Sequence, residues 1–158
     1  MKTSTYWLFV FLFLISPVAR AGGDKEVAQI SFHLETDASD NPKMIFPHKL
    51  MGKQRFFRRM PEISSKDFKA FNPFPSEDQA SYGVLIQLKE SAGKRFLACT
   101  TAGQGKWLVC QAFGRVVDSV IIDQPVNDHV IVVWKGLTLE EIRDLDKVMP
   151  RVGEEKKK

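Results

Sequence analysis

The sequence has few of the residues from which metal sites and nucleophilic sites are built. Its 158 residues include two cysteines and three histidines. The histidines form no HExxH or HxH pattern, and the GxSxG turn of serine hydrolases and the GxxxxGKS/T phosphate loop are both missing. We therefore assign no catalytic residue, no metal ligand and no cofactor. We expect His33, His48 and His129 to be surface residues, with His33 on the polar side of a strand.

The two cysteines, Cys99 and Cys110, cannot by themselves form a full structural zinc site. Outside the cytoplasm an isolated pair is most simply a disulfide. Closing a loop this short would stabilise the fold by roughly 3 kcal/mol. The alternative is a pair of reduced, buried thiols that pack as small apolar residues. The sequence leaves both alternatives open.

Long hydrophobic runs are also scarce, and the one present lies at the N-terminus. The basic start Met1-Lys2 precedes an unbroken apolar run over 6–15, which Pro17 ends before the small-residue site Ala19-Arg20-Ala21. This order is typical of a secretory signal peptide. The run falls well short of the roughly 20 residues of a membrane-spanning helix. We predict cleavage after Ala21, with an uncleaved anchor as the alternative, and a periplasmic or secreted mature chain without a transmembrane segment.

Positive charge is in slight excess overall and strongly concentrated in one segment. The net charge of +4 falls to +2 when residues 1–21, with Lys2, Arg20 and no acid, are removed, which argues against a nucleic-acid partner. The segment 43–59 contains basic residues and no acid. It predicts a surface for an anionic partner, formed by Lys49, Lys53, Arg55, Arg58 and Arg59. We favour the alternative that Phe56 and Phe57 anchor this segment in the core while the basic side chains are solvated.

Hydrophobic periodicity and capping residues divide the rest of the chain into one α+β domain over residues 22–150. The pattern predicts strands over 27–36, 82–88, 106–111, 116–122 and 129–134, an extended piece over 44–46 ended by Pro47, and helices over 63–71, 91–101 and 138–149. Ser64 with Asp67, and Thr138 with Glu141, mark two helix starts. A hairpin over 95–111 is the alternative to the second helix. We expect a mainly antiparallel sheet with two or three helices packed on one face, and a disordered charged tail over 151–158.

The order of elements between residues 82 and 145 matches a known module. A strand is followed by a helix with Phe96 and Thr100 in the pattern FxxxT, a glycine turn and three strands. The last helix opens with the pattern GxTxxE, at Gly136, Thr138 and Glu141. This arrangement resembles the head subdomain of the first periplasmic domain of SecD, the accessory subunit of the bacterial preprotein translocase. The resemblance implies an exported α+β module associated with the handling of polypeptide.

The chain also departs from that family. It has Phe113-Gly114 where the family usually has Asp-Gly, and the multi-helix membrane part of the family is missing, so proton-driven translocation is not implied. The sequence therefore favours an exported, non-catalytic binding module whose partner is a protein or an extended peptide. The alternatives are a small extracytoplasmic hydrolase with a dispersed site and a binder of the anionic envelope surface through residues 43–59.

The signal-peptide interpretation predicts that the mature protein begins at Gly22 and is found outside the cytoplasm. The cleavage site after Ala21 follows an apolar run that is too short to span a bilayer. N-terminal sequencing of the exported form tests this directly. A membrane-bound form that still begins at Met1 would contradict it.

Overall fold

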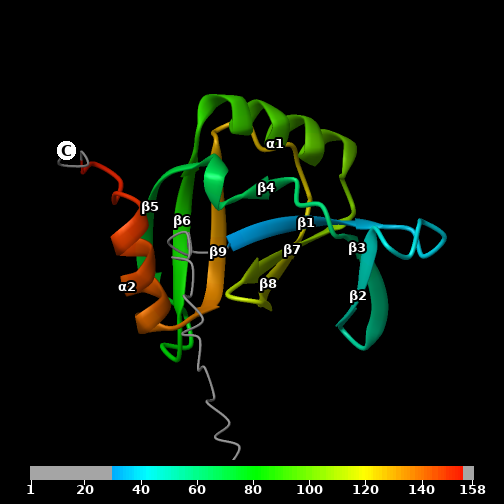
Figure 1. Ribbon diagram of the computed structural model, residues 1–158, viewed down its shortest axis with the longest axis horizontal. Coiled ribbons are helices and arrows are strands. Elements are labelled where there is room, and N and C mark those ends of the chain that lie inside the picture. Colours follow the sequence, from blue (N-terminus) through cyan, green and yellow to red (C-terminus); the bar gives the residue numbers. More distant parts are fainter. Residues whose placement is uncertain (1–29, 155–158) are drawn as a thin grey trace, which may run out of the picture.

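The computed structural model describes residues 30–154, which form two antiparallel sheets and two α-helices (Figure 1). The predicted signal peptide and residues 155–158 lie outside the described residues. The elements are β1 (Ile30–Thr36), β2 (Ile45–Leu50), β3 (Lys53–Arg58), β4 (Ile63–Ser64), the 3-10 helix η1 (Ser65–Asp67), β5 (Phe68–Pro75), β6 (Tyr82–Leu88), α1 (Glu90–Ala102), β7 (Trp107–Ala112), β8 (Arg115–Ile121), β9 (Val130–Leu137) and α2 (Leu139–Val148). The α+β class predicted from sequence is confirmed, with the strands divided between two sheets.

The two sheets meet at their edges. The larger has the order β2-β3-β1-β7-β8, with β4 added on β1, and the smaller has the order β5-β6-β9. Strands β8 and β9 are therefore edge strands of different sheets. Figure 1 shows α1 across one end of both sheets and α2 against the smaller one.

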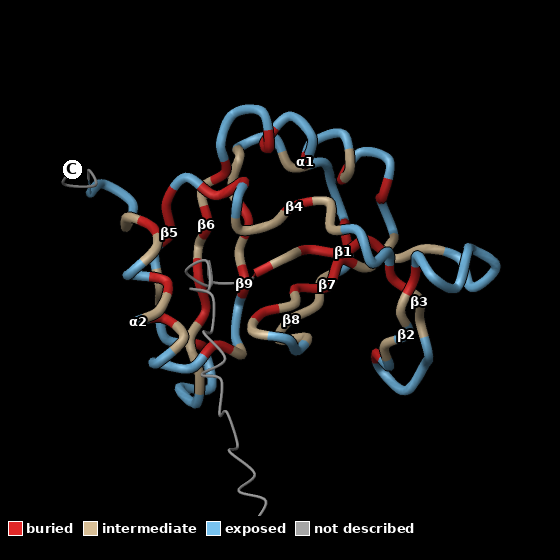
Figure 2. Tube along the Cα trace, in the orientation of Figure 1, coloured by how far each residue is buried: buried red, intermediate tan, exposed pale blue. Residues whose placement is uncertain are grey.

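The main core lies where the sheets and helices meet. Ile30 of β1, Ile86 of β6, Phe96 of α1 and Leu145 of α2 all belong to it and are almost completely buried. Figure 2 shows the buried stretches of β1, β6 and β7 running through the middle of the molecule. Removal of this apolar surface from water is the main force that holds the two sheets together.

A second, smaller core lies under the β2–β3 hairpin. Leu50 and Phe57 pack there against Val109 of β7. Phe57 is completely buried, whereas Phe56 is half-buried. The expectation that a phenylalanine of the basic segment anchors it in the protein interior is therefore confirmed. The hairpin thereby covers part of one face of the larger sheet, around Val109, and shields it from solvent.

Both well-marked helices form. Residues 91–101 lie in α1, as predicted, and its buried face includes Ala92, Phe96 and Thr100. At the start of α2, the Glu141 N–H donates to Thr138 Oγ1 at 3.2 Å and the Thr138 N–H donates to Glu141 Oε2 at 2.8 Å. The capping box read from the sequence is thus present.

The predicted helix over 63–71 is wrong beyond its first turn. The Ser64 N–H donates to the Asp67 carboxylate at 2.9 Å, as the capping signal suggested. The turn nevertheless ends at Asp67, and Phe68 begins strand β5. Pairing with β6 buries Phe68 and Phe71 in the main core. This long-range burial outweighs a local helix signal, because most helix stability in proteins comes from packing.

Pro47 and Pro73 lie within strands, and Pro75 is the last residue of one. Pro47 was expected to stop a short extended piece, but β2 continues through it to Leu50. β2 pairs only with β3, so it is an edge strand, where the missing proline N–H can face solvent. Pro73 and Pro75 lie in β5, an edge strand of the smaller sheet.

The chain beyond α2 remains folded past the predicted start of the tail at residue 151. The Phe71 N–H donates to the Pro150 carbonyl at 3.1 Å, and the Val152 N–H donates to the Phe71 carbonyl at 2.9 Å. Arg151 also binds the Asp146 carboxylate through two hydrogen bonds of 2.7 and 2.8 Å. The charged residues and the glycine of this segment predicted a disordered tail. They could not reveal its pairing with β5, because β5 lies far away along the chain.

The cap of α2 can be tested by the substitution Thr138→Ala. Loss of the side-chain acceptor leaves a helix N–H unpaired, and we expect the free energy of unfolding to fall by about 1 kcal/mol. Denaturant titration measures the change, with Thr101→Ala as the control, because Thr101 is exposed at the far end of α1. A loss no larger than that of the control would mean that the capping box contributes nothing.

Candidate functional site

Asp118 of β8 connects the two sheets. Its Oδ1 accepts the N–H of Ser119 at 2.8 Å, and its Oδ2 accepts the N–H of Trp134 in β9 at 2.7 Å. One carboxylate thereby binds backbone N–H groups on two neighbouring edge strands. Hydrogen bonds to an ionised acceptor are stronger than those between neutral groups. Asp118 holds β8 and β9 together without a backbone ladder between them.

On one side of Asp118 the two strands approach closely. Gly136 of β9 has a positive φ of +94°, and a Cβ built there would lie 2.6 Å from the carbonyl oxygen of Val117. Any other residue would push the strands apart at this point. Arg115 of β8 reinforces the closure, since one of its nitrogens donates to the Gly136 carbonyl and to Glu141 Oε2, both at 2.9 Å.

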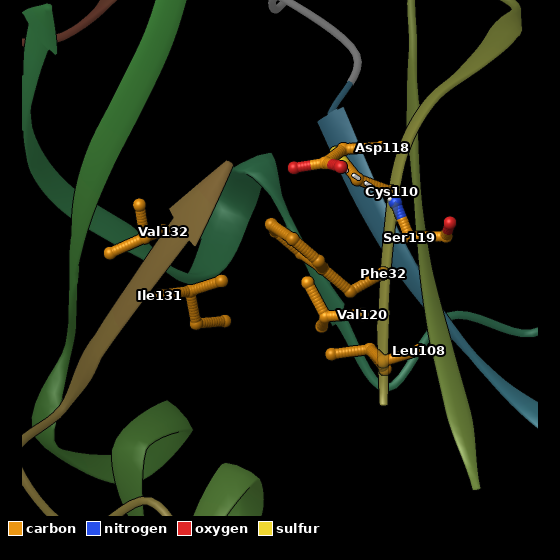
Figure 3. A pocket seen from close by; sticks show the side chains of 8 residues that line it. All are labelled: Phe32, Leu108, Cys110, Asp118, Ser119, Val120, Ile131 and Val132. Atoms are coloured by element: carbon orange, nitrogen blue, oxygen red, sulfur yellow. Dashed lines mark hydrogen bonds between the residues drawn. The ribbon is translucent and has the colours of Figure 1, made fainter. Parts of the chain in front are cut away.

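On the other side of Asp118 a cleft lies between β8 and β9. It is a shallow cleft with a volume of about 20 Å³, enough for about one water molecule. Its lining residues come from both sheets: Phe32, Leu108, Cys110, Asp118, Ser119, Val120, Ile131 and Val132. In Figure 3, Phe32, Val120 and Ile131 point toward one another across the gap. The cleft is mostly apolar, with the Asp118 carboxylate at one end.

The backbone of β9 beside this cleft has a free edge. The Trp134 N–H points to Asp118, away from β6, and the Val130 N–H donates to Asp128 Oδ1 at 3.0 Å. Because N–H directions alternate along a strand, Val132 between them points to the same side. No strand pairs with that side of β9 within residues 30–154. Val132 therefore offers its N–H and carbonyl to an incoming backbone, while aspartates cap the N–H groups on either side.

The disulfide alternative is not what the structure shows, because Cys99 and Cys110 are free thiols. Cys110 lines the cleft from β7, next to Asp118. Cys99 lies on α1, close enough to Glu62 and Arg58 to be influenced by their charges. Burial raises the pKa of Cys99 to about 11 and raises that of Cys110 further. Both side chains stay protonated at neutral pH, which is typical of inert, structural thiols.

The structure does not gather the predicted basic surface onto one face. Since alternate residues of a strand point to opposite sides, the β2–β3 register places Lys49 and Arg58 on one face of the hairpin and Lys53 and Arg55 on the other. Lys49, Lys53 and Arg59 are exposed. Lysine on the edge strand β2 also has a structural use, because it discourages pairing with another chain.

Two of the predicted basic residues are held by acids. Arg58 pairs with Glu62 at 3.1 Å, and Arg55 pairs with Glu35 at 2.6 Å. The Arg55 guanidinium also lies over the Trp107 ring, 5.4 Å from its centroid, and Glu35 accepts the Trp107 N–H at 2.9 Å. Arg55 therefore joins β3, β1 and β7, and its position is explained by the fold.

His33 is buried, contrary to the expectation that it lies on a polar strand face. Its Nδ1 donates to the Arg58 carbonyl at 2.7 Å, Nε2 lies 2.8 Å from Ser31 Oγ, and the ring packs against Phe46. Burial lowers the pKa of His33 below its usual value. The prediction failed because Phe46 and the Arg58 carbonyl of the β2–β3 hairpin lie against the His33 ring, so this face of β1 is covered as well. His48 and His129 are half-buried, and the described residues contain no group of metal-ligating side chains.

Sequence reasoning missed the residues that define the cleft, above all Asp118, Val132 and Trp134. One signal was available for Asp118. It is the only charged residue in the otherwise apolar run VVDSVII, and a charge in such a run indicates a specific partner. Nothing in the sequence marks Val132, because its importance comes from an unpaired backbone.

Comparison with known proteins supports the fold. No protein-family model matches the sequence, and no curated protein matches it. A solved structure of SecDF, described as a membrane component that enhances protein export, has 18% identity and a TM-score of 0.54 over 77% of this chain and 61% of that chain. A second structure, of SecDF in a super-membrane-facing form, has 17% identity and a TM-score of 0.55 over 78% of this chain.

The described residues therefore have a fold similar to part of SecDF, and the resemblance first seen over residues 82–145 extends to most of the chain. The chain spans 61% of the first of these structures and 19% of the second. None of the helices within residues 30–154 is long and apolar enough to cross a membrane.

The burial of His33 predicts that the protein loses stability in mild acid. Because its pKa is lowered on folding, the unfolded chain binds the proton more readily. The contribution of His33 is complete above the unfolded pKa of about 6.5 and is lost as the pH falls below it. Urea titrations across this range measure the effect. His33→Gln should flatten the profile and His48→Gln should preserve it, and equal slopes in all three proteins would exclude His33 as the cause.

The basic segment yields a prediction that separates structure from binding. Arg55→Gln should lower the free energy of unfolding by about 1 kcal/mol, because Glu35 loses its partner. The exposed control Arg59→Gln should stay within about 0.5 kcal/mol. The triple variant with Gln at 55, 58 and 59 should bind anionic phospholipid vesicles no less than the unaltered protein in a sedimentation assay. Salt-sensitive vesicle binding that the triple variant loses would instead establish this segment as an anionic-partner surface.

Proposed function

We propose that this chain is an exported module that binds extended polypeptide at the free edge of β9, over the cleft that separates it from β8. One observation is central to the proposal. Within residues 30–154 no strand pairs with the edge of β9 at Val132, and this edge adjoins an apolar cleft lined from both sheets. Addition of a strand to an exposed sheet edge is a common way in which proteins recognise peptides.

The two parts of the site have different roles in this mode of binding. Backbone hydrogen bonds to Val132 would give affinity that is independent of the peptide sequence. Because side chains of a bound strand alternate, one in two would point toward the cleft among Phe32, Val120 and Ile131. An apolar side chain that covers the shallow cleft would remove apolar surface of both molecules from water, which stabilises the complex. Asp118 limits the site, since its carboxylate already occupies the N–H of Trp134.

The cellular setting supports the same function. The predicted signal peptide would place the module outside the cytoplasm, where exported chains are unfolded before they reach their final structure. The similar solved structures belong to SecDF, which is described as enhancing protein export. A module that holds extended segments without sequence-specific contacts fits such a task.

The proposal predicts that filling the cleft abolishes peptide binding. Val120 points into the cleft, whereas its neighbour Ile121 is half exposed and does not line it. Val120→Phe should weaken binding of a fluorescein-labelled peptide with alternating valine and serine by about tenfold or more, because the larger ring would protrude from the shallow cleft into the space of the bound strand. Ile121→Phe adds a ring on the same strand and should leave affinity unchanged. Fluorescence anisotropy measures both.

The backbone contribution needs its own control. The same peptide with N-methyl groups on alternate amides cannot pair with a strand edge, and it should bind far more weakly than the parent peptide. Equal affinity for both peptides, or equal loss in the Val120 and Ile121 variants, would rule out binding by strand addition at this cleft.

A further inference from the structure

A second hollow lies on the smaller sheet, beside the C-terminal part of β9. Its volume is about 600 Å³, within the range of about 300–1,000 Å³ that is typical of small-molecule sites. It is lined by Phe74 of β5, by residues 75–78 that follow it, and by Trp134 and Lys135 of β9. We call it the Trp134 groove. It shares no lining residue with the β8–β9 cleft.

Two aromatic rings form the apolar part of the groove. Trp134 is 59% exposed, and its ring meets that of Phe74 at an angle of 70°, with 6.2 Å between the centroids. The Phe74 ring lies over β6 at Gly83, where a Cβ would come within 2.4 Å of it. Glycine at this position therefore lets the two rings lie together on the sheet surface. Exposed apolar surface that is contiguous, rather than scattered, marks binding sites.

The polar part of the groove is the loop after β5, which is tied to β9. The Asp78 carboxylate accepts hydrogen bonds from the Ser76 hydroxyl at 2.6 Å and from the Ala80 N–H at 3.0 Å, and both lower the pKa of Asp78. At the end of the loop, Ser81 Oγ accepts the Gly136 N–H of β9 at 3.0 Å. The carboxylate is therefore ionised at neutral pH and fixed in position beside the two rings.

Charges of both signs line the groove. Glu77 and Asp78 offer carboxylate oxygens, which accept hydrogen bonds, and Lys135 offers an ammonium group, which donates them. Lys135 is close enough to Asp78 for its charge to lower the pKa of that carboxylate. A cationic ligand would therefore be opposed by Lys135, and an anionic one by the two carboxylates. This rim suits a neutral ligand that carries donors and acceptors together.

We infer that the Trp134 groove binds neutral sugar rings of a β-linked polysaccharide. Each carbon of such a ring is bonded to oxygen, so its hydrogens carry partial positive charge and are attracted to the negative face of an aromatic ring. In β-linked glucose the ring substituents are all equatorial, so both faces of the ring present only hydrogens. One face would cover Trp134, and the hydroxyls at the edge would meet the carboxylates and Lys135.

Other ligands use only one part of the groove. An aliphatic or aromatic ligand would cover the rings but would take the charged rim out of water without giving it hydrogen-bond partners. A flexible polyol would satisfy the rim but has no flat face for Trp134. The predicted signal peptide would also place the groove outside the cytoplasm, where structural polysaccharides occur. The inference goes beyond the proposed function and does not depend on it.

A titration with cellotriose, which consists of three β-linked glucose units, tests the inference. NMR follows the indole N–H of Trp134, assigned with Trp134→Phe, and the backbone amides of Glu77 and Asp78. We expect these signals to shift together along one saturating curve. Trp134→Ala should weaken binding, measured at the two loop amides, by about fivefold or more, because the stacking surface is lost. Met60→Ala truncates another exposed apolar side chain outside the groove and should leave the affinity unchanged.

Two further comparisons test the chemistry of recognition. Sorbitol has hydroxyls like those of glucose but no ring, and at the same concentration it should leave the signals in place. The pair Glu77→Gln with Asp78→Asn should weaken cellotriose binding by about threefold, since neutral acceptors form weaker hydrogen bonds than carboxylates. The matched control, Asp37→Asn with Glu140→Gln, removes the same charge at exposed positions outside the groove and should keep the affinity.

Several outcomes would overturn the inference. Cellotriose could shift none of the signals, sorbitol could shift them equally, or Trp134→Ala could bind as tightly as the unaltered protein. Unchanged affinity in the variant at residues 77 and 78, or an equal loss in its matched control, would also overturn it. Because the titration contains no peptide, its result leaves the proposed function untouched, and failure of the peptide experiments leaves the sugar site standing.

Discussion

The arrangement of this protein depends on the carboxylate of Asp118, which binds backbone N–H groups on the edge strands of two sheets. A continuous ladder between β8 and β9 would have merged the sheets and left no edge between them. A side chain instead fixes their separation at one point, and Gly136 allows contact on one side of that point. The strands can therefore part on the other side, where the apolar cleft lies. The cleft is thus a consequence of joining the sheets through a side chain.

This junction also controls which part of an exposed edge is available. Free strand edges promote aggregation, and proteins normally block them with charges, prolines or covering segments. The edge strand β2 contains Pro47 and Lys49, and the edge of β5 is covered by residues 150–152. On β9, Asp118 and Asp128 accept the N–H groups on either side of Val132. The open edge is consequently short. A short edge next to an apolar cleft can bind an extended chain while offering little surface for self-association.

The similarity to SecDF concerns the fold and covers only part of the compared chains. The Asp118 bridge between β8 and β9 defines the cleft of this chain. In the basic hairpin, several residues of the sequence pattern have structural roles. Arg55 and Arg58 belong to ion pairs that hold the hairpin on the larger sheet, and Phe57 fills the small core below it. Arg55, Arg58 and Phe57 therefore contribute to the stability of the hairpin.

The sequence by itself determined the elements whose signals are local. Thr138 and Glu141 cap α2 within four residues, the alternation over 82–88 gives β6, and Phe96 and Thr100 give α1 one apolar face. These patterns were enough for the α+β class. Only the tertiary structure decided that Phe68 and Phe71 enter a strand, that His33 is buried, and that residues 118 and 134 lie together. The physical reason is that burial and strand pairing depend on segments far apart in the sequence, whereas caps and periodicity depend on neighbours.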